Sequence, residues 1–382
     1  MTDRIVATRR RQTSLVLVAF SSVIAMFISL APVWSQPDLS PETITARERF
    51  FGPDNVNASG MVRADRVILS WLSVGGLAMA IDGHVVLLDA YIHKGQDQPN
   101  YVPTTIDELV ALKPDAVFIG HGHFDHAASS GEIVARTQAL LIGTPEHCDL
   151  AASQARAYQG QDVSVSCIAA VGRGSAIGTQ NEFFPFGPFG TGVSVRAVKH
   201  MHSAAEPPDG ERHETSLTSG ALPDAGSILL HPPGPDMVQN LFPFTNDEGS
   251  SILYQFKIGQ FTLVWNDTGG PLRSKAPGVL AVMGQMPSTD VQLGSVLGFN
   301  DPTNGMRDIV DYVVALKPKI FFPIHHDFVT EYGMSKNLEG VFKRELARRD
   351  PQSTEIRWLY DPYDYIRPYL MTFDIANPRF AD

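Results

Sequence analysis

The stretch His121-Gly122-His123-Phe124-Asp125-His126 places four potential metal ligands within six residues. The run before it, residues 116–119, is short, apolar and β-prone, a pattern that predicts a buried strand. Gly120 then frees the backbone, so the ligands follow the C-terminal end of this strand, where open α/β sheets place their chemistry. Neutral imidazoles and a carboxylate suit zinc or another borderline divalent metal. A surface cluster of histidines without a metal is the alternative, and the dense spacing makes it the weaker interpretation.

This motif has the form HxHxDH and resembles the signature of the metallo-β-lactamase superfamily. Members of that superfamily hold one or two metals between two halves built of β and α layers. The resemblance covers roughly Val67 to Phe328. It implies an α/β fold, an αββα sandwich in which two related β-rich halves face each other and the helices lie outside.

The same resemblance implies a site for two divalent metal ions built from seven residues, which are His121, His123, Asp125, His126, His202, Asp267 and His325. The first ion would take the two leading histidines of the motif and His202. The second would take Asp125, His126 and His325, and Asp267 would bridge the two. Asp125 and Asp267 are the expected catalytic residues, and Asp89 matches a structural aspartate. Zinc is the expected metal, with manganese and iron as alternatives.

Two histidine pairs leave a choice of ligand. His200 and His202 lie two residues apart at the end of a predicted strand over 193–198, so both can face the site only if the strand has ended. His202 is favoured because it lies at the exit of this strand and is followed by serine. His325 is favoured over His326 because an internal repeat aligns it with the first ligand of the motif.

This repeat relates residues 109–121 to residues 313–325 without gaps. Each copy is a predicted helix, a Lys-Pro stop, a buried strand and a histidine at the end of the strand. A predicted hairpin ending in aspartate precedes each copy, at Asp89 and at Asp267. Chance likeness between two amphipathic helices would explain the helices but not the aligned Ala-Leu-Lys-Pro and histidine. The repeat therefore predicts one domain of two related halves that share a metal site.

Local signals predict further elements. Asp82-Gly83 predicts a hairpin turn, because both positions need a positive φ. Capping-box patterns begin at Thr105 and Ser129 and predict helices before and after the motif. The expected strands cover residues 67–69, 77–81 and 85–88. A second hairpin is expected over residues 252–267, and helices over residues 149–158, 307–317 and 335–348.

Residues 1–35 are expected to be a secretory signal peptide. Four arginines form a basic start, residues 14–31 are apolar, and Val33 and Ser35 offer small side chains at a cleavage site. An uncleaved anchor is the alternative, because the apolar run approaches membrane-spanning length. Cleavage would give a periplasmic or secreted protein with no stable membrane insertion.

The remaining chain is expected to form one domain. The whole chain has 382 residues, of which 43% are hydrophobic, enough for one large domain or two small ones. Residues 36–60 are polar and are expected to form an N-terminal arm. Residues 61–382 would form the metallo-β-lactamase-like domain. Residues 203–249, rich in Pro, Gly, Asp and Ser, would be a long loop insertion of functional significance.

Charge and cysteine content limit the partners and the compartment. Without residues 1–35 the chain keeps 26 basic and 40 acidic residues, a net charge of −14. Such a protein is not an evident nucleic-acid binder. Cys148 and Cys167 are the two cysteines, and the sequence leaves open whether they form a disulfide or two free thiols. The oligomeric state is open as well.

Residues 71–77 and 87–91 narrow the resemblance to the branch of ascorbate-phosphate lactonases and N-acylphosphatidylethanolamine phospholipase D-like enzymes. It implies an exported hydrolase in which water activated by two metals cleaves an ester, lactone or phosphodiester bond of a small molecule. An iron-dependent oxidoreductase and a non-catalytic metal-binding protein are the alternatives. His93 is a candidate substrate contact. Four phenylalanines are expected either to line an apolar pocket or to take part in ordinary loop packing; they are Phe183, Phe184, Phe186 and Phe189.

Overall fold

The computed structural model describes residues 39–92, 104–183, 189–190, 192–203, 249–297, 304–327, 334–350, 354–361 and 363–380. The expected signal peptide, nearly all of the 203–249 insertion, His93, Phe184 and Phe186 lie outside these residues. Among the described residues, no helix combines the length and apolar character needed to cross a membrane.

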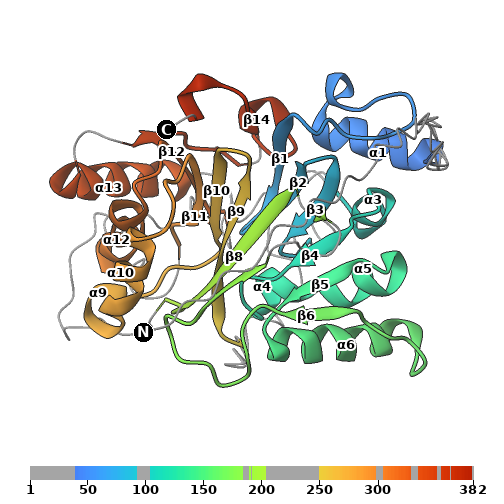
Figure 1. Cartoon of the computed structure of the whole chain (residues 1–382), viewed down its shortest axis with the longest axis horizontal. Coiled ribbons are helices and arrows are strands. Elements are labelled where there is room, and N and C mark those ends of the chain that lie inside the picture. Colours follow the sequence, from blue (N-terminus) through green and yellow to red (C-terminus); the bar gives the residue numbers. More distant parts are fainter. Residues whose placement is uncertain are drawn as a thin grey trace, which may run out of the picture. The chain divides into compact units, whose positions relative to one another are not determined.

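Two seven-stranded mixed sheets form the body of the domain (Figure 1). Sheet 1 has the order β14-β1-β2-β3-β4-β5-β6 and consists of β14 (Thr372–Asp374), β1 (Arg66–Ser73), β2 (Gly76–Ile81), β3 (His84–Leu88), β4 (Ala116–Phe118), β5 (Leu140–Gly143) and β6 (Cys167–Ala169). Sheet 2 has the order β13-β12-β11-β10-β9-β8-β7 and consists of β13 (Glu355–Ile356), β12 (Ile320–Ile324), β11 (Val291–Ser295), β10 (Phe261–Asn266), β9 (Ser251–Ile258), β8 (Val193–His200) and β7 (Gln180–Phe183).

Each sheet joins an antiparallel part to a parallel part. In sheet 1, β1, β2 and β3 are antiparallel neighbours, and β4, β5 and β6 follow in parallel. In sheet 2, β8, β9 and β10 are antiparallel, and β11, β12 and β13 follow in parallel. β14 closes the free edge of β1, with Val67 opposite Phe373. The C-terminal ends of the parallel strands meet at one edge of each sheet, which is where the motif lies.

Side chains alternate between two buried layers along each central strand. Leu69 and Trp71 of β1 belong to the core between the sheets, with Tyr254 and Trp265 of sheet 2. Their neighbour Ile68 instead packs under the helices outside sheet 1. Both faces of these strands are therefore buried, which explains why apolar side chains point to both sides rather than alternating with polar ones.

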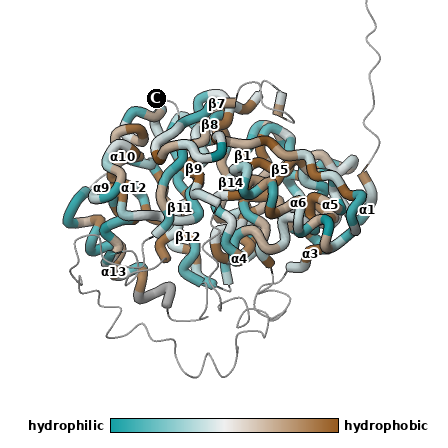
Figure 2. The backbone as a smooth tube through the Cα atoms, turned by 90° about the horizontal axis from the view of Figure 1, so that it is seen from below, coloured by the Kyte–Doolittle hydropathy of each residue, from teal (hydrophilic) through white to brown (hydrophobic). Residues whose placement is uncertain are grey.

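Helices cover the outer face of each sheet (Figure 1). Sheet 1 is covered by α1 (Pro41–Phe51), α3 (Ile106–Ala111), α5 (Ser130–Thr137) and α6 (Pro145–Gln159). Sheet 2 is covered by α9 (Leu272–Lys275), α10 (Pro277–Gly284), α12 (Arg307–Leu316) and α13 (Met334–Arg349). Figure 2 shows hydrophobic residues along β5 and hydrophilic residues around the outer helix α9. The expected αββα sandwich is confirmed.

Short 3-10 helices complete the described elements. They are η1 (Pro53–Asn55), η3 (Pro368–Met371) and η4 (Pro378–Phe380). The predicted turn at Asp82-Gly83 is confirmed, with φ of 50° and 79°. The Thr105 side chain accepts from the Glu108 amide, as its capping signal predicts. The helix predicted after Ser129 is present as α5, but the predicted capping box is wrong, because the Ser129 side chain makes no capping hydrogen bond.

The sequence predicts an N-terminal arm on the surface over residues 36–60, but residues 41–51 form helix α1. Ser40 caps this helix through the Thr43 amide, and Pro41 occupies its first turn. Phe50 and Phe51 are fully buried in the core outside sheet 1. This segment is therefore part of the folded domain.

The internal repeat is wrong as a structural equivalence, although the two halves do share their topology. β4 lies directly beside the hairpin strand β3, whereas β11 separates β12 from the hairpin strand β10. By position in its sheet, β12 corresponds to β5. What the repeated residues encode is a local helix end, since Lys113 and Lys317 both adopt a left-handed conformation, with φ of 48° and 49°, before proline.

The two cysteines form a disulfide. Cys148 of α6 is bonded to Cys167 of β6, with a Cα–Cα distance of 5.9 Å. The bond ties the last parallel strand of sheet 1 to the helix that packs outside it. The question left open by the sequence is thus answered for the folded chain.

Candidate metal centre

The expected ligands come from four separate segments, and Asp89 from a fifth, that meet at the C-terminal ends of strands. The motif follows β4, with α4 (Phe124–Ala127) opening inside it. His202 follows β8, Asp267 follows β10 and His325 follows β12. Asp89 follows β3 and is fully buried. Strands from both sheets thus deliver their ligands to one place, as expected for the chemistry of open sheets.

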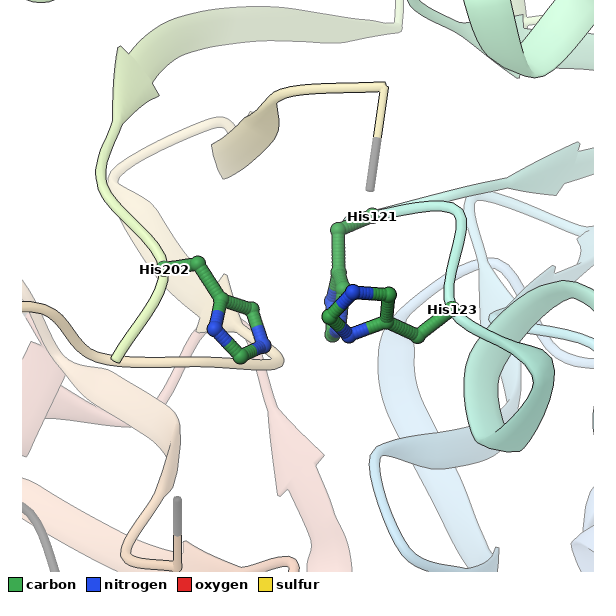
Figure 3. A group of neighbouring side chains, drawn as sticks. All are labelled: His121, His123 and His202. Carbon is green, nitrogen blue, oxygen red and sulfur yellow. The ribbon is translucent and has the colours of Figure 1, made fainter. Parts of the chain in front are cut away.

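His121, His123 and His202 form the first group (Figure 3). Nε2 of His121 lies 3.1 Å from Nδ1 of His123, and the ring of His202 lies 4.6 Å from each of the other two rings. Nδ1 of His202 lies 3.0 Å from the Ser203 carbonyl oxygen, a contact in which the ring donates. Its Nε2 lone pair is then available to a cation.

Asp125, His126 and His325 form the second group. Nε2 of His126 lies 3.1 Å from Nε2 of His325 and 3.4 Å from Oδ2 of Asp125. The same Asp125 oxygen is 3.3 Å from Nε2 of His325. Three potential ligand atoms from two segments therefore converge on a single point.

Asp267 lies between the two groups and is fully buried. Its Oδ2 accepts from Nδ1 of His121 at 2.7 Å and lies 3.3 Å from Nδ1 of His126. Its Oδ1 is buried with no hydrogen-bond partner among the described residues. A buried carboxylate oxygen without a donor is costly unless a cation satisfies it.

Asp89 touches one of the expected ligands directly. Its Oδ2 accepts from Nδ1 of His126 at 2.6 Å, and its Oδ1 accepts from the Gly120 amide at 3.1 Å. A carboxylate on one ring nitrogen leaves the other as the ligand atom and fixes the ring orientation. The structural role expected for Asp89 is thus seen as a contact that orients His126.

Two glycines make room for these carboxylates. A Cβ on Gly120 would stand 2.1 Å from Cγ of Asp267. A Cβ on Gly75 would stand 2.7 Å from Oδ2 of Asp89 and 3.1 Å from Cε1 of His126. Any larger residue would push the acidic side chains out of place, so the glycines are required by close approach.

Burial keeps the histidines of the first group neutral. It lowers the pKa of His202 to about 3 and the pKa of His121 well below its usual value. His123, less deeply buried, has its pKa lowered for the same reason. Neutral imidazoles are the form that binds metal, so no proton has to be removed near neutral pH.

The second group carries charge. Burial opposes the ionisation of Asp125, but His126 and His325 hold the pKa of that carboxyl well below its usual value. Burial also opposes a charge on His126, yet Asp125, Asp89 and Asp267 raise its pKa well above the usual value. Burial, followed by the Asp267 carboxylate, raises the pKa of Asp89 itself. Several carboxylates thus compete for one imidazole, and a cation would relieve this competition.

The donor set fits divalent metal. Two ligands bound at 2.0–2.2 Å to one tetrahedral ion stand about 3.4 Å apart, close to the 3.1–3.4 Å found within the two groups. Imidazole and carboxylate donors suit zinc, manganese and iron alike. All seven expected ligands lie in the contacts described above. Their geometry does not distinguish between these metals.

The two disfavoured histidines point elsewhere. His200 is buried, and its Nδ1 lies 2.8 Å from the hydroxyl of Tyr312 on α12. His326 packs its ring 5.1 Å from Trp71 and 5.0 Å from Trp358. Neither lies in the groups described above. The Tyr312 hydroxyl also accepts from the Gly270 amide at 3.1 Å, and so ties the exit of β8 to the loop after Asp267.

The aromatic residues expected near a pocket are only partly described. Phe189 is buried and stacks on Phe118 in the core between the sheets. This is ordinary packing. Phe183 is half-buried and packs against the same core. The structure thus favours the packing interpretation for the two that it describes.

Comparisons with known proteins find similarity over part of the sequence and in the arrangement of the fold. No family model matches the chain. A UPF0173 metal-dependent hydrolase of Methanopyrus kandleri is 35% identical over 78 residues, 20% of this chain and 31% of that protein. The chain therefore matches less than a third of the length of this curated relative.

Solved structures share the layered arrangement at low identity. Igni18, a metallo hydrolase of Ignicoccus hospitalis, is 14% identical with a TM-score of 0.47, covering 77% of this chain and 95% of that chain. CmlA, a diiron β-hydroxylase of Streptomyces venezuelae, is 11% identical with a TM-score of 0.43, covering 79% and 54%. Two stacked mixed sheets with helices on both outer faces are the arrangement of the metallo-β-lactamase fold. At these identities and TM-scores, neither neighbour indicates the activity of this chain.

Proposed function

We propose that this chain is a metal-dependent hydrolase of the metallo-β-lactamase superfamily, holding two divalent ions. The observation that carries the proposal is the convergence of two ligand groups, one on His121 and one on His126, with Asp267 between them. A protein that merely folds in this way has no need to bury this many ionisable groups together. The name of the Methanopyrus relative supports the same activity.

The side chains divide into roles. His121, His123 and His202 would hold one ion, and Asp125, His126 and His325 the other. Asp267 would join the two ions, and Asp89 orients His126 through its Nδ1. When bound, such ions lower the pKa of water towards neutrality and polarise a carbonyl or phosphoryl oxygen. Both cysteines are held in the disulfide, so neither is available as a nucleophile.

The substrate class is proposed to be an ester, lactone or phosphodiester of a small molecule, as in the lactonase and phospholipase D-like branch. These three bonds share an oxygen leaving group and an electrophilic centre that two cations can contact at once. The net charge of −14 without residues 1–35 speaks against a nucleic-acid substrate.

Export is proposed as well. The disulfide between Cys148 and Cys167 suits an oxidising compartment such as the periplasm or the extracellular medium. The basic start and apolar run of residues 1–35 provide a route to it. The two features are independent of each other and point to the same location.

Elemental analysis combined with an activity panel tests the function. The purified protein is expected to contain about two equivalents of zinc or manganese and to hydrolyse at least one of a lactone, an aryl ester or a bis-aryl phosphodiester. Chelation should abolish this activity, and adding the metal back should restore it. A fully loaded protein that is inactive on all three classes argues against a hydrolase. Bound iron together with oxygen consumption would favour the oxidoreductase instead, since iron takes the same ligands.

A further inference from the structure

The turn between β1 and β2 lies against the metal centre and is strained. Val74 in this turn has φ of 53° and is fully buried. A β-branched residue in the left-handed region is a genuine outlier, because its side chain crowds the backbone. Such a conformation persists only where the surrounding structure imposes it, and such residues cluster at functional sites.

Asp327 is the group that holds this turn. Its carboxylate oxygens accept from the Val74 amide at 2.9 and 3.1 Å, and Oδ2 also accepts from the Tyr365 hydroxyl. Asp327 is fully buried. It follows β12 of sheet 2, whereas Val74 belongs to sheet 1. A charge-assisted hydrogen bond therefore links the two halves of the sandwich beside the site.

The same turn fixes the backbone of a ligand. The Val74 carbonyl oxygen accepts from the His325 amide at 3.0 Å and from Nε1 of Trp71 at 3.1 Å. His325 itself has φ of 60°. The Val74 amide thus donates to Asp327, and the Val74 carbonyl oxygen accepts from the His325 amide. Asp327 and His325 lie two residues apart on the loop after β12. The two bonds clamp the loop that presents the His325 imidazole to His126.

Gly75, the next residue of the turn, touches the acidic side of the centre. Its carbonyl oxygen accepts from Nε1 of Trp265 at 3.2 Å. A Cβ placed on it would meet Asp89, Asp267 and His126. Movement of the turn would therefore disturb His126 and Asp267 as well as His325.

We propose that Asp327 is a positioning residue of the metal centre, which holds His325 in place by clamping the Val74–Gly75 turn. It is not among the seven ligands, and it acts through the backbone of Val74. This inference rests on the proposed metal centre. Outer contacts of this kind typically change metal affinity by 10–100-fold when they are removed.

The test compares Asp327→Ala with a matched control, Asp290→Ala. Asp290 is also a buried carboxylate that accepts a backbone amide, that of Thr262 at 2.8 Å, but at the opposite end of β10 from Asp267. Affinity for the second equivalent of Zn²⁺ is measured by competition with a chelator on each folded variant. Asp327→Ala should weaken it by about 10–100-fold. Asp290→Ala should leave it unchanged while lowering thermal stability.

Two further variants separate positioning from general support. Asp327→Asn keeps an acceptor for the Val74 amide and should recover most of the lost affinity. In a Val74→Gly background the turn no longer needs to be forced into a positive φ. In that background, the loss of Zn²⁺ affinity caused by Asp327→Ala should be at least about threefold smaller than in the parent chain. This is the coupling expected between residues of one hydrogen-bonded network. Equal losses in the two backgrounds, or equal effects of the two alanine variants, would overturn the inference.

Hydrogen exchange distinguishes this inference from the proposed function. The His325 amide should exchange faster in Asp327→Ala than in the parent chain or in Asp290→Ala, with no metal present. A parent chain that binds no second Zn²⁺ would refute the dinuclear centre, while faster exchange would still support the clamp. Unchanged exchange at His325 would refute the clamp whatever metal the protein binds.

Discussion

Gly120→Ala would test whether close backbone approach places the Asp267 carboxylate, the proposed bridge between the two ions. The added Cβ would stand 2.1 Å from Cγ of Asp267 and 2.2 and 2.4 Å from its oxygens, whereas ordinary contact begins at 3.4 Å. The carboxylate must therefore retreat by roughly 1 Å. Metal sites tolerate errors of only about 0.2 Å in ligand distance. We expect loss of bound metal, and a loss of stability of about 1–3 kcal/mol from overpacking.

The assay is metal content after dialysis against a metal-buffered solution, together with thermal unfolding in the presence of chelator. Gly278→Ala is the control, because a Cβ there meets nothing within 4 Å and Gly278 lies in α10. It should keep its metal with little change in stability, because Gly278 lies in the first turn of α10 and the added methyl group meets no neighbour. If Gly120→Ala binds as much metal as the parent chain at an unchanged midpoint, the close approach is not what positions Asp267.

Three further outcomes are expected. His325→Ala should lower metal content, and His326→Ala should leave it largely intact but lower the melting temperature; equal metal loss would contradict the geometry. Asp267→Ala should reduce kcat by about 10²-fold or more, with a smaller change in KM. Steady-state kinetics on a hydrolysed substrate measure both constants, and an unchanged kcat would rule out a bridging role for Asp267. Exported protein should begin near Gln36 by N-terminal sequencing, and retention of Met1 in the membrane fraction would contradict cleavage.

Local signals predicted those parts of the fold that depend on a few neighbouring residues. The Asp82-Gly83 turn needs two positive φ angles, and the sequence shows the residues that tolerate them. The Thr105 cap works within one helical turn. The HxHxDH stretch is likewise local, because four ligands on one loop are close in space wherever the loop lies. The αββα layers then followed from the resemblance that this motif carries.

Long-range placement was predicted less well. The match between residues 109–121 and 313–325 reflects a shared helix end, and sheet order places β4 and β12 differently. His325 still reaches the site because parallel strands of one sheet end at the same edge. In α1 a signal was present in Ser40-Pro41, and the polar composition of the segment obscured it. The strain at Val74 and its contact with Asp327 depend on how two sheets stack, which no local pattern encodes.

The C-terminal strand β14 completes the edge of β1, the first strand of sheet 1. Val67 and its partner Phe373 are about 300 residues apart, which at roughly 5–20 residues per second separates their synthesis by tens of seconds. During that interval the edge of β1 lacks its neighbour, and bare strand edges pair with other chains. A stop codon or a cut before Thr372 would make this state permanent. Truncated chains that retain all seven proposed ligands would then be lost to aggregation rather than to faulty chemistry.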